Sequence, residues 1–348
     1  MRIGILGTRG IPNAYGGFEQ FAEFLALGLS QKGHTVYVYN SSLHPFTGNK
    51  WNNIHIIHCK DLENKIGTAG QFFYDLNCIK DARKRKFDVL LQLGYTSNSI
   101  WHRLWPKNCI NIVNMDGLEW KRSKYNAAAQ KFLKLAEKWA AKYGKILIAD
   151  SVGIQQYLSH TYHKQSVFIP YGAHVFSSPD HKWLEEWNIK PHLYHLLIAR
   201  MEPENNIEMI IKGHLAAKHP YPLILIGNYT NAFGQYLYKK YNSAEIRFKG
   251  GLYDQKKINN IRYYSALYFH GHSVGGTNPS LIEAMGCGCN IAAHDNIFNR
   301  AVLGEDAFYF SDEDSIAAVL RNDYSSPAIT SRKKENIAKV ETLYNWET

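Results

Sequence analysis

The chain has 348 residues, 45% hydrophobic and 14% aromatic, with 40 Lys and Arg against 30 Asp and Glu for a formal charge of +10. This length predicts two domains, and the composition excludes a disordered chain. No apolar run approaches the roughly 20 residues that cross a bilayer, and the first residues resemble a strand, not a signal peptide. The basic charge favours an anionic partner: nucleic acid, anionic lipid or a phosphorylated small molecule.

The first half of the chain alternates predicted strands with predicted helices. Short apolar runs predict strands at Arg2–Leu6, Thr35–Tyr39, Ile54–His58, Asp88–Leu93, Ile110–Asn114 and Lys145–Ala149. Apolar residues at helical spacing predict helices at Phe18–Gln31, Gln71–Lys84 and Asn126–Tyr143. This alternation predicts a parallel sheet covered by helices on both faces.

The second half repeats the pattern. Strands are predicted at Tyr194–Ala199, Pro222–Ile226, Ile246–Lys249, Leu267–His270, Asn290–Ala293 and Phe308–Phe310. Helices are predicted at Asn206–Lys218, Ala232–Tyr241, Tyr253–Ser265 and Pro279–Met285. Ile169–Pro191 is the best linker candidate. Two doubly wound α/β domains would face a cleft, and such sheets bind ligands at the carboxyl ends of their strands.

The five cysteines are odd in number and lack the spacing of zinc ligands. Cys287 and Cys289 are one residue closer together than the usual zinc knuckle, and no second pair accompanies them. We therefore expect reduced, structural thiols in a cytoplasmic protein.

A glycine-rich segment, Gly7–Glu19, directly follows the first predicted strand. Such a loop before a helix presents backbone N–H groups to a phosphate, although glycines alone also fit a tight turn. A dinucleotide fingerprint is disfavoured, because Pro12 interrupts the helix and the second strand ends in Asn40, which is not an acid for a ribose. The helix starts after Gly16 and Gly17, and we expect this pair to face a phosphate.

A second motif, Asn114–Ser123, follows a strand and carries Asp116 and Glu119 beside Trp120. Two carboxylates at the carboxyl end of a strand are placed to face a cleft. The alternative is a helix-capping Asp116 and a solvated Glu119. Asp116 is the better catalytic candidate because it sits nearer the strand end.

A third motif, Ala199–Asn206, opens the second domain after its first strand. Arg200 at the strand end is suited to a bidentate grip on phosphate, with a surface arginine as the alternative. Asn205 or Asn206 is expected to cap the following helix.

A fourth motif, His270–Gly288, is again a strand, a glycine loop and a helix start, with Pro279 in the first helical turn. Glu283 lies on an otherwise apolar stretch, and a ribose diol would be a good partner for it. His270 and His272 lack a third ligand, so a metal is disfavoured.

The acidic run Asp312–Asp314 matches the Asp-x-Asp pattern that holds a divalent metal on a nucleotide sugar in single-domain glycosyltransferases. Acidic residues at a helix N-terminus are the ordinary explanation, and we prefer it here.

These four motifs, in this order, resemble one family. The chain is similar to the retaining, nucleotide-sugar-dependent glycosyltransferases of family four, which have the two-domain GT-B fold. Gly7–Glu19, Asp116–Trp120, Ala199–Asn206 and Gly275–Ser280 resemble bacterial β-1,4-L-rhamnosyltransferases, which build capsule and cell-wall polysaccharide. The resemblance covers nearly the whole chain and is more specific for the fold and the donor type than for the sugar.

The resemblance implies an acceptor-side domain at 1–170, a nucleotide-sugar-binding domain at 171–330 and, at 331–348, a helix returning toward the first domain. It implies catalytic roles for Asp116 near the transferred sugar, Arg200 on the diphosphate and Glu283 on the ribose. The expected donor-binding residues are Gly16, Gly17, Arg200, Asn205, Gly275, Gly276, Thr277, Asn278 and Glu283. The expected acceptor-side residues are Glu119 and Tyr15.

The sequence departs from the wider family at four places. Gly275 stands where the family has a glutamate, Asn205 where it usually has a lysine, and Asp116 where it often has a histidine. The first two departures match the rhamnosyl subgroup, so they favour a deoxysugar and place more of the phosphate charge on Arg200. The family's last helix is expected to be short here, or the chain to be trimmed.

The implied reaction is metal-independent hexosyl transfer with retention, from dTDP-L-rhamnose to a lipid-linked or oligosaccharide acceptor. In the front-face route suggested for such enzymes, the leaving phosphate takes the acceptor proton and no protein nucleophile is needed. We expect no metal and no other cofactor. A UDP- or GDP-sugar donor is the first alternative, and an NAD-dependent enzyme that modifies nucleotide sugars is an alternative of another class.

Basic residues concentrate in the first domain. They are Arg83–Lys86 and Lys121, Arg122, Lys124, Lys131, Lys134, Lys138, Lys142 and Lys145. A solvated helix face is one interpretation. The other is a surface that meets anionic lipid or a pyrophosphate-linked acceptor, which predicts a cytoplasmic protein at the inner face of the plasma membrane. We expect no nucleic-acid partner, because no binding motif is present and the glycine loops would be unexplained.

Overall fold

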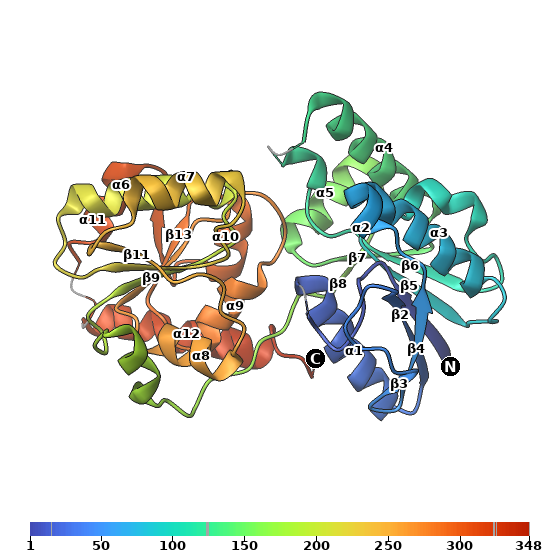
Figure 1. Cartoon of the computed structure of the whole chain (residues 1–348), viewed down its shortest axis with the longest axis horizontal. Coiled ribbons are helices and arrows are strands. Elements are labelled where there is room, and N and C mark those ends of the chain that lie inside the picture. The colour runs from blue at the N-terminus through green and yellow to red at the C-terminus, as the bar shows by residue number, and fades with distance from the viewer. Residues whose placement is uncertain (15, 123–124, 323, 325, 348) are drawn as a thin grey trace. The chain divides into compact units, whose positions relative to one another are not determined.

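The computed structural model describes residues 1–14, 16–122, 125–322, 324 and 326–347. The chain divides after Pro170 into two compact units, each built on one sheet with helices on both faces (Figure 1). The predicted fold class, two doubly wound α/β domains, is confirmed. In the described residues, no helix combines the length and the apolar character needed to span a bilayer.

The sheet of the first unit has eight strands within the described residues, in the order β3-β4-β2-β1-β5-β6-β7-β8. Their bounds are β1 Arg2–Leu6, β2 Thr35–Ser41, β3 Lys50–Trp51, β4 Ile54–Cys59, β5 Val89–Leu93, β6 Ile110–Asn114, β7 Ile146–Ala149 and β8 Val167–Phe168. All neighbours are parallel except β3, which pairs antiparallel with β4.

Helices connect these strands. Their bounds are α1 Gly17–Gln31, α2 Glu63–Ile66, α3 Gly70–Ala82, α4 Ala127–Tyr143 and α5 Val152–Tyr162, with 3₁₀ turns η1 Gly67–Ala69, η2 Ser99–Leu104 and η3 Glu119–Lys121. The cap of α4 is Asn126, whose side chain accepts from the N–H of Ala129 at 2.9 Å. Phe21, Ala22 and Ala26 form the buried side of α1.

The second unit has a fully parallel sheet in the order β11-β10-β9-β12-β13-β14. The strands are β9 His195–Ile198, β10 Leu223–Ile226, β11 Ile246–Phe248, β12 Leu267–His270, β13 Ile291–His294 and β14 Phe308–Phe310. The helices are α6 Ile207–Ala217, α7 Ala232–Tyr241, α8 Gln255–Tyr263, α9 Pro279–Gly286, α10 Ile297–Leu303, α11 Glu313–Val319 and α12 Pro327–Thr342, with η4 His181–Trp187 and η5 Pro203–Asn205. In Figure 1, α6, α7 and α11 cover one face of this sheet, and α8, α9 and α12 cover the other.

Strand order reverses once in each sheet. From β1 the chain first builds toward β4 and then crosses to β5, and from β9 it builds toward β11 and then crosses to β12. Loops that leave neighbouring strands in opposite directions open a crevice at their carboxyl ends, and doubly wound sheets bind ligands there. The structure therefore favours the ends of β1 and β5, and of β9 and β12, as binding positions.

Several elements were not predicted. Among them are β3, β8 and α10, which are too short to show a periodicity, and α5, which Ser151 caps by accepting from the N–H of Ile154 at 3.2 Å. Asn206 occupies the N-cap position of α6, as predicted, but its side chain makes no cap hydrogen bond and donates to the carbonyl of Gly271 instead. At the C-terminal end, α12 packs on α9 within the second unit, and its expected return toward the first domain stays a prediction.

Candidate functional site

The loop after β1 is held rigidly by side chains. Glu19, buried in the first turn of α1, accepts from the Thr8 hydroxyl at 3.0 Å and from the Arg9 N–H at 2.8 Å. Asn40 accepts from the Ile11 N–H at 3.1 Å and donates to its carbonyl at 2.8 Å. Glu19 and Asn40 thus satisfy backbone groups of the loop, and sequence reasoning had assigned them no such role.

Glycine is required in this loop where the chain passes close to its neighbours. Gly7 has φ +88°, and a Cβ there would lie 2.3 Å from the carbonyl oxygen of Leu93. Gly10 has φ +129°, and its Cβ would collide with the side chain of Asn40. Both conformations are ones that residues with a side chain rarely adopt.

Gly16 and Gly17 mark the start of α1. Gly16 is its extended N-cap residue, and the helix begins at Gly17, one residue before the predicted start at Phe18. The first N–H groups of any α-helix lack partners within the helix and carry partial positive charge. Tyr15, predicted on the acceptor side, lies outside the described residues.

Asp116 and Glu119 follow β6, next to β5 in the sheet. Asp116 has φ +48°, an uncommon conformation for a residue other than glycine, and its N–H donates to Asn114 Oδ1 at 3.0 Å. Backbone outliers of this kind gather at functional sites. Glu119 begins η3, is almost fully buried, and pairs with Arg122 at 2.5 Å.

A buried carboxylate supports this loop from α4. Glu137, only 2% exposed, accepts hydrogen bonds or an ion pair from five donors. The donors are Tyr95 Oη at 3.3 Å, Trp120 Nε1 at 3.0 Å, Lys134 Nζ at 3.0 Å, Tyr157 Oη at 2.6 Å and Tyr162 Oη at 2.5 Å. We call these six residues the Glu137 cluster. Because Tyr95 also donates to the carbonyl of Gly117 at 3.4 Å, the cluster fixes the loop that carries Asp116.

In the second unit, Arg200 and Asn205 follow β9. Arg200 is exposed at the carboxyl end of the strand, where the sequence placed it. Asn205 is buried, donates to the carbonyl of Arg200 at 2.7 Å and bonds through Oδ1 to His272 Nδ1 at 2.9 Å. Asn205 therefore connects the loop after β9 to the loop after β12.

The glycine loop after β12 leads into α9. Gly275 has φ +130°, Thr277 is buried, and Asn278 caps α9 by accepting from the N–H of Ser280 at 2.9 Å. Pro279 occupies the first helical turn, as predicted. Gly276 lies between these residues, so all four predicted loop residues precede the N-terminus of α9 directly.

Two asparagines hold the same loop from α10. Asn296 and Asn299 both donate to the carbonyl of His272, at 3.1 and 3.0 Å. Neither was predicted, since nothing in their local sequence relates them to a loop more than twenty residues earlier.

Glu283 has a protein partner that the sequence did not reveal. Arg262 Nη2 lies 2.6 Å from Glu283 Oε2, and Arg262 is 1% exposed. Burial acts to lower the pKa of Arg262, but Glu283 and smaller contributions from neighbouring groups together outweigh burial, so the pKa is raised above its ordinary value. Breaking such a buried pair costs about 3–5 kcal/mol.

The acidic run at Asp312–Asp314 caps a helix. Asp312 accepts from the N–H of Ser315 at 2.8 Å, and the Ser315 hydroxyl lies 3.1 Å from the N–H of Asp312. The helix-capping interpretation is confirmed. Across the described residues, no group of three or more His, Cys, Asp or Glu side chains is arranged to hold a metal ion.

The structure brings the predicted residues together within each unit. Arg200 and Asn205 lie beside the loop of Gly275–Asn278 at the strand reversal of the second sheet. Gly16, Gly17, Asp116 and Glu119 follow β1 and β6 at the same edge of the first sheet. Each unit therefore carries its own group of predicted residues at the carboxyl edge of its sheet.

Solved structures with the same architecture span the whole chain. Sucrose-phosphate synthase from Thermosynechococcus elongatus is 17% identical, with a TM-score of 0.82 over 99% of this chain and 95% of that chain. Anabaena HepE in complex with UDP is 13% identical, with a TM-score of 0.75 over 99% and 96%. A glycosyltransferase from Rickettsia africae is 12% identical, with a TM-score of 0.69 over 99% and 94%.

These likenesses define the fold as that of the GT-B glycosyltransferases. A family model described as a domain of unknown function, DUF1972, matches residues 1–174, which is half of the chain. The chain belongs to this family. No curated protein sequence matches it.

Proposed function

We propose that the protein is a retaining glycosyltransferase that moves a sugar from a nucleotide-sugar donor to a lipid-linked or oligosaccharide acceptor. The observation that carries this proposal is the set of groups at the strand reversal of the second sheet. Arg200 and Asn205 follow β9, Asn205 bonds to His272 in the loop after β12, and the Gly275–Asn278 part of that loop leads into α9, which carries Glu283. Anabaena HepE, which shares the fold, has been solved with UDP and with UDP-glucose, and this supports a nucleotide-sugar donor.

The charges of these groups suit a nucleoside diphosphate. Arg200 presents an exposed guanidinium for the diphosphate, and the first turn of α9 adds backbone N–H groups and the positive end of its dipole. Glu283 offers a carboxylate for the hydroxyls of the pentose. In the first unit, Gly16 and Gly17 at the start of α1 are the residues that we predict to bind the diphosphate.

The proposed chemistry follows from these positions. Negative charge develops on the leaving diphosphate as the sugar becomes oxocarbenium-like, and Arg200 with two helix N-termini stabilises that charge. The leaving phosphate takes the proton of the acceptor, so no protein nucleophile is required. We keep two roles in the described residues as predictions, Asp116 beside the transferred sugar and Glu119 on the acceptor side. No resident metal or cofactor takes part in this scheme.

Among the donors, we propose dTDP-L-rhamnose, in the synthesis of bacterial surface polysaccharide. The support is the resemblance of the four motifs to rhamnosyltransferases, including Gly275 and Asn205 at the two changed positions. UDP- and GDP-sugars are the alternatives within the fold. Asn40 disfavours an NAD-dependent enzyme. Dinucleotide-binding domains have an acidic residue for the ribose at this position, whereas the Asn40 amide hydrogen-bonds to the backbone of Ile11.

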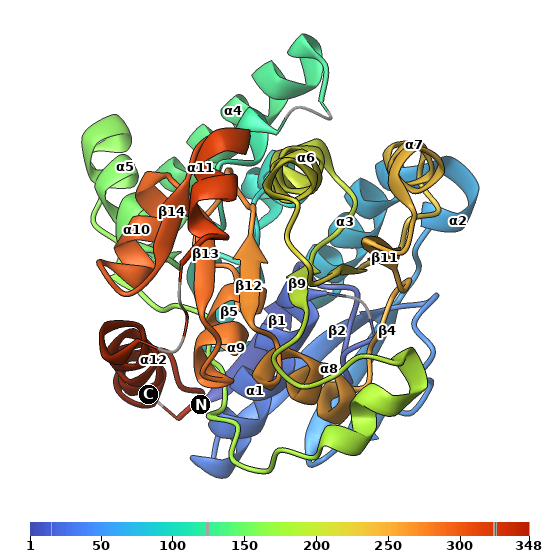
Figure 2. The same ribbon diagram turned by 90° about the vertical axis from the view of Figure 1, so that its left-hand side faces the viewer.

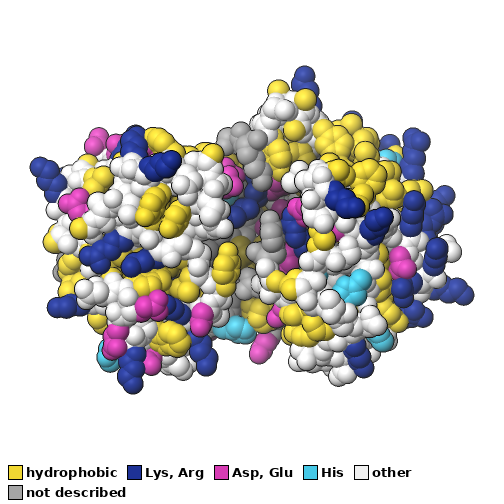
Figure 3. All heavy atoms as spheres, in the orientation of Figure 1, with side chains coloured by type: hydrophobic (Ala, Val, Ile, Leu, Met, Phe, Trp, Pro, Cys, Tyr) yellow, Lys and Arg dark blue, Asp and Glu magenta, His cyan; other side chains and the backbone are white. Residues whose placement is uncertain are grey.

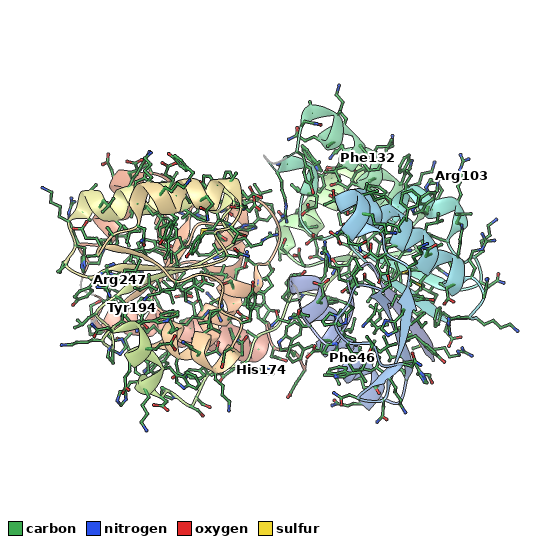
Figure 4. The ribbon with its side chains drawn as sticks, viewed as in Figure 1. Phe46, Arg103, Phe132, His174, Tyr194 and Arg247 are labelled. Carbon is green, nitrogen blue, oxygen red and sulfur yellow. The ribbon has the colours of Figure 1, made fainter. Side chains whose placement is uncertain are left out.

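We propose that the protein works at the inner face of the plasma membrane and binds it through the first unit. Along α4, exposed Lys131, Lys138 and Lys142 flank Leu135, whose side chain is also exposed. Figure 3 shows apolar side chains gathered over α4, with Lys and Arg along the α3 edge of the same unit. Arg103, in η2, points outward at this edge, and Phe132 lies on α4 (Figure 4). Lysines beside exposed apolar side chains fit an anionic lipid surface.

A thermal-shift panel with dTDP, UDP, GDP and NAD tests the function. We expect dTDP to raise the melting temperature most, because only a ligand that binds the folded state stabilises it. A rise in melting temperature with UDP or GDP alone would identify a different nucleotide in the donor but would still support a glycosyltransferase. A shift with NAD alone would contradict the proposal.

A further inference from the structure

We propose that Arg262 positions Glu283 to recognise a hydroxyl of the donor's pentose. The inference rests on the proposed function, in which Glu283 contacts that pentose. Arg262 is buried and does not itself meet the nucleotide, so it is a positioning residue and not a catalytic one.

The guanidinium of Arg262 ties α8 to the first turn of α9. Arg262 Nη2 is 2.6 Å from Glu283 Oε2 and 3.2 Å from Ser280 Oγ, and both of these residues belong to α9. Arg262 Nη1 is 3.2 Å from the Oδ1 of Asn259, on its own helix. Figures 1 and 2 show α8 and α9 side by side in the second unit. The carboxylate of Glu283 is thus held by a group that is fixed on a neighbouring element.

Arg262 is itself held firmly. The carbonyl of Arg262 accepts from Ser265 Oγ at 2.7 Å and from Cys289 Sγ at 3.2 Å. The carbonyl of Ile261 accepts from the hydroxyl of Tyr194 at 2.5 Å. Tyr194 is buried and directly precedes β9 (Figure 4). Because its backbone and its guanidinium both have several partners, Arg262 provides a rigid base for Glu283.

The burial pattern favours positioning over simple stabilisation. A buried ion pair adds little stability compared with apolar residues of the same size, because both charges lose their hydration. The Arg262 side chain is 2% exposed, while that of Glu283 is 16% exposed. One carboxylate oxygen of Glu283 is therefore held by a buried group, while part of the Glu283 side chain is exposed. A carboxylate fixed before binding loses less side-chain freedom when a ligand arrives.

The expected consequence is selectivity for a nucleotide hydroxyl. dTDP has a single hydroxyl on its pentose, at the 3′ position, and 2′,3′-dideoxythymidine diphosphate lacks it. A hydrogen bond from this hydroxyl to a fixed, ionised carboxylate favours dTDP by about tenfold. Without Arg262, the Glu283 side chain samples other rotamers, and the preference falls while the contacts to the base and the diphosphate persist.

The test is titration calorimetry of both nucleotides on the full chain. We expect wild-type protein to prefer dTDP by about tenfold, and Arg262→Met and Glu283→Gln to reduce the preference to about twofold or less. Affinity for the dideoxy nucleotide should stay within about threefold of wild type in both variants. Arg262→Lys keeps the buried charge and should keep part of the preference, so it carries the test if Arg262→Met does not fold. Arg300→Met is the matched control, because it breaks the exposed pair with Asp295 on α10 and should leave the preference intact.

The possible results separate the two proposals. A folded Arg262 variant that keeps the full preference overturns the positioning role, as does wild-type protein that binds both nucleotides equally. Failure of wild-type protein to bind dTDP, UDP or GDP at all overturns the proposed function instead.

Discussion

At the scale of single residues, Arg200 is the most exposed charge at the candidate donor site and carries the largest part of the proposal. Arg200→Ala should abolish donor binding and sugar transfer, because a charge-assisted contact to the diphosphate is lost. The fold should be unaffected, since only the backbone carbonyl of Arg200 takes part in the described loop contacts.

Calorimetry with dTDP and a melting curve measure these two effects separately. Arg321→Ala removes another exposed arginine from the same unit and serves as the control. Binding within about twofold of wild type in Arg200→Ala would remove this residue from the site.

The sequence predicts residues whose signal is local and misses those that act from a distance. Gly16, Pro279 and Asp312 are local signals of a helix start. In the structure each is the first residue of a helix or directly precedes it. Arg262 and Glu283 are 21 residues apart on different helices, so no spacing rule relates them. Asn40 directly follows the predicted strand Thr35–Tyr39, but its hydrogen bonds to the backbone of Ile11 depend on how β1 and β2 pair.

At the scale of elements, α4 combines a buried and an exposed function. Its inner face holds Glu137 among aromatic donors, and its outer face presents lysines. Lys134 belongs to the inner group, because its Nζ contacts Glu137 and lies 4.3 Å from the centroid of the Trp120 ring. The basic run of the sequence is therefore divided between two faces.

The outer face of α4 predicts binding to anionic vesicles. Replacing Lys131, Lys138 and Lys142 together by Gln should lower the affinity for phosphatidylglycerol vesicles, measured by sedimentation, by about 100-fold at low salt, at about 1 kcal/mol for each lysine. A control variant that replaces the exposed Lys239, Lys256 and Lys334 of the second unit should bind as wild type. Wild-type protein that stays in the supernatant would refute the membrane surface.

At the scale of the whole molecule, the alternating pattern predicts two parallel sheets, while the order of their strands follows from packing. Short apolar runs identify β1, β9 and most other strands within one or two residues. Which strands are neighbours depends on the side to which each crossover turns, and the local sequence does not contain that information. The binding edges at β1–β5 and β9–β12 become visible only with the sheet order.

The pH dependence of stability is another property of the whole molecule. Burial lowers the pKa of His195 to about 2, of His214 to about 4 and of His270 to about 3. In the unfolded chain these histidines have their ordinary pKa near 6.5, so they bind protons below that pH. In the folded chain they stay neutral, so the free energy of unfolding decreases as the pH drops below 6.5. Burial raises the pKa of Asp75 to about 7, so this one carboxyl group makes the folded state more stable as the pH drops, opposite to the three histidines.

Urea unfolding at pH 7 and pH 5 measures the net effect of these groups on the free energy of unfolding. Each of the three histidines contributes a loss of up to about 1.4 kcal/mol per pH unit below 6.5, so the free energy of unfolding should be clearly smaller at pH 5. Equal or greater stability at pH 5 would show that these histidines are not buried in their neutral form.

The central claim is that this chain transfers a sugar from a nucleotide donor. The most direct measurement incubates the purified protein with dTDP-L-rhamnose and a bacterial lipid extract, and follows free dTDP and the glycolipid products by mass spectrometry. We predict release of dTDP together with a lipid heavier by one deoxyhexose, and loss of both with Arg200→Ala. Folded protein that releases no nucleoside diphosphate from dTDP-, UDP- or GDP-sugars under these conditions would contradict the claim.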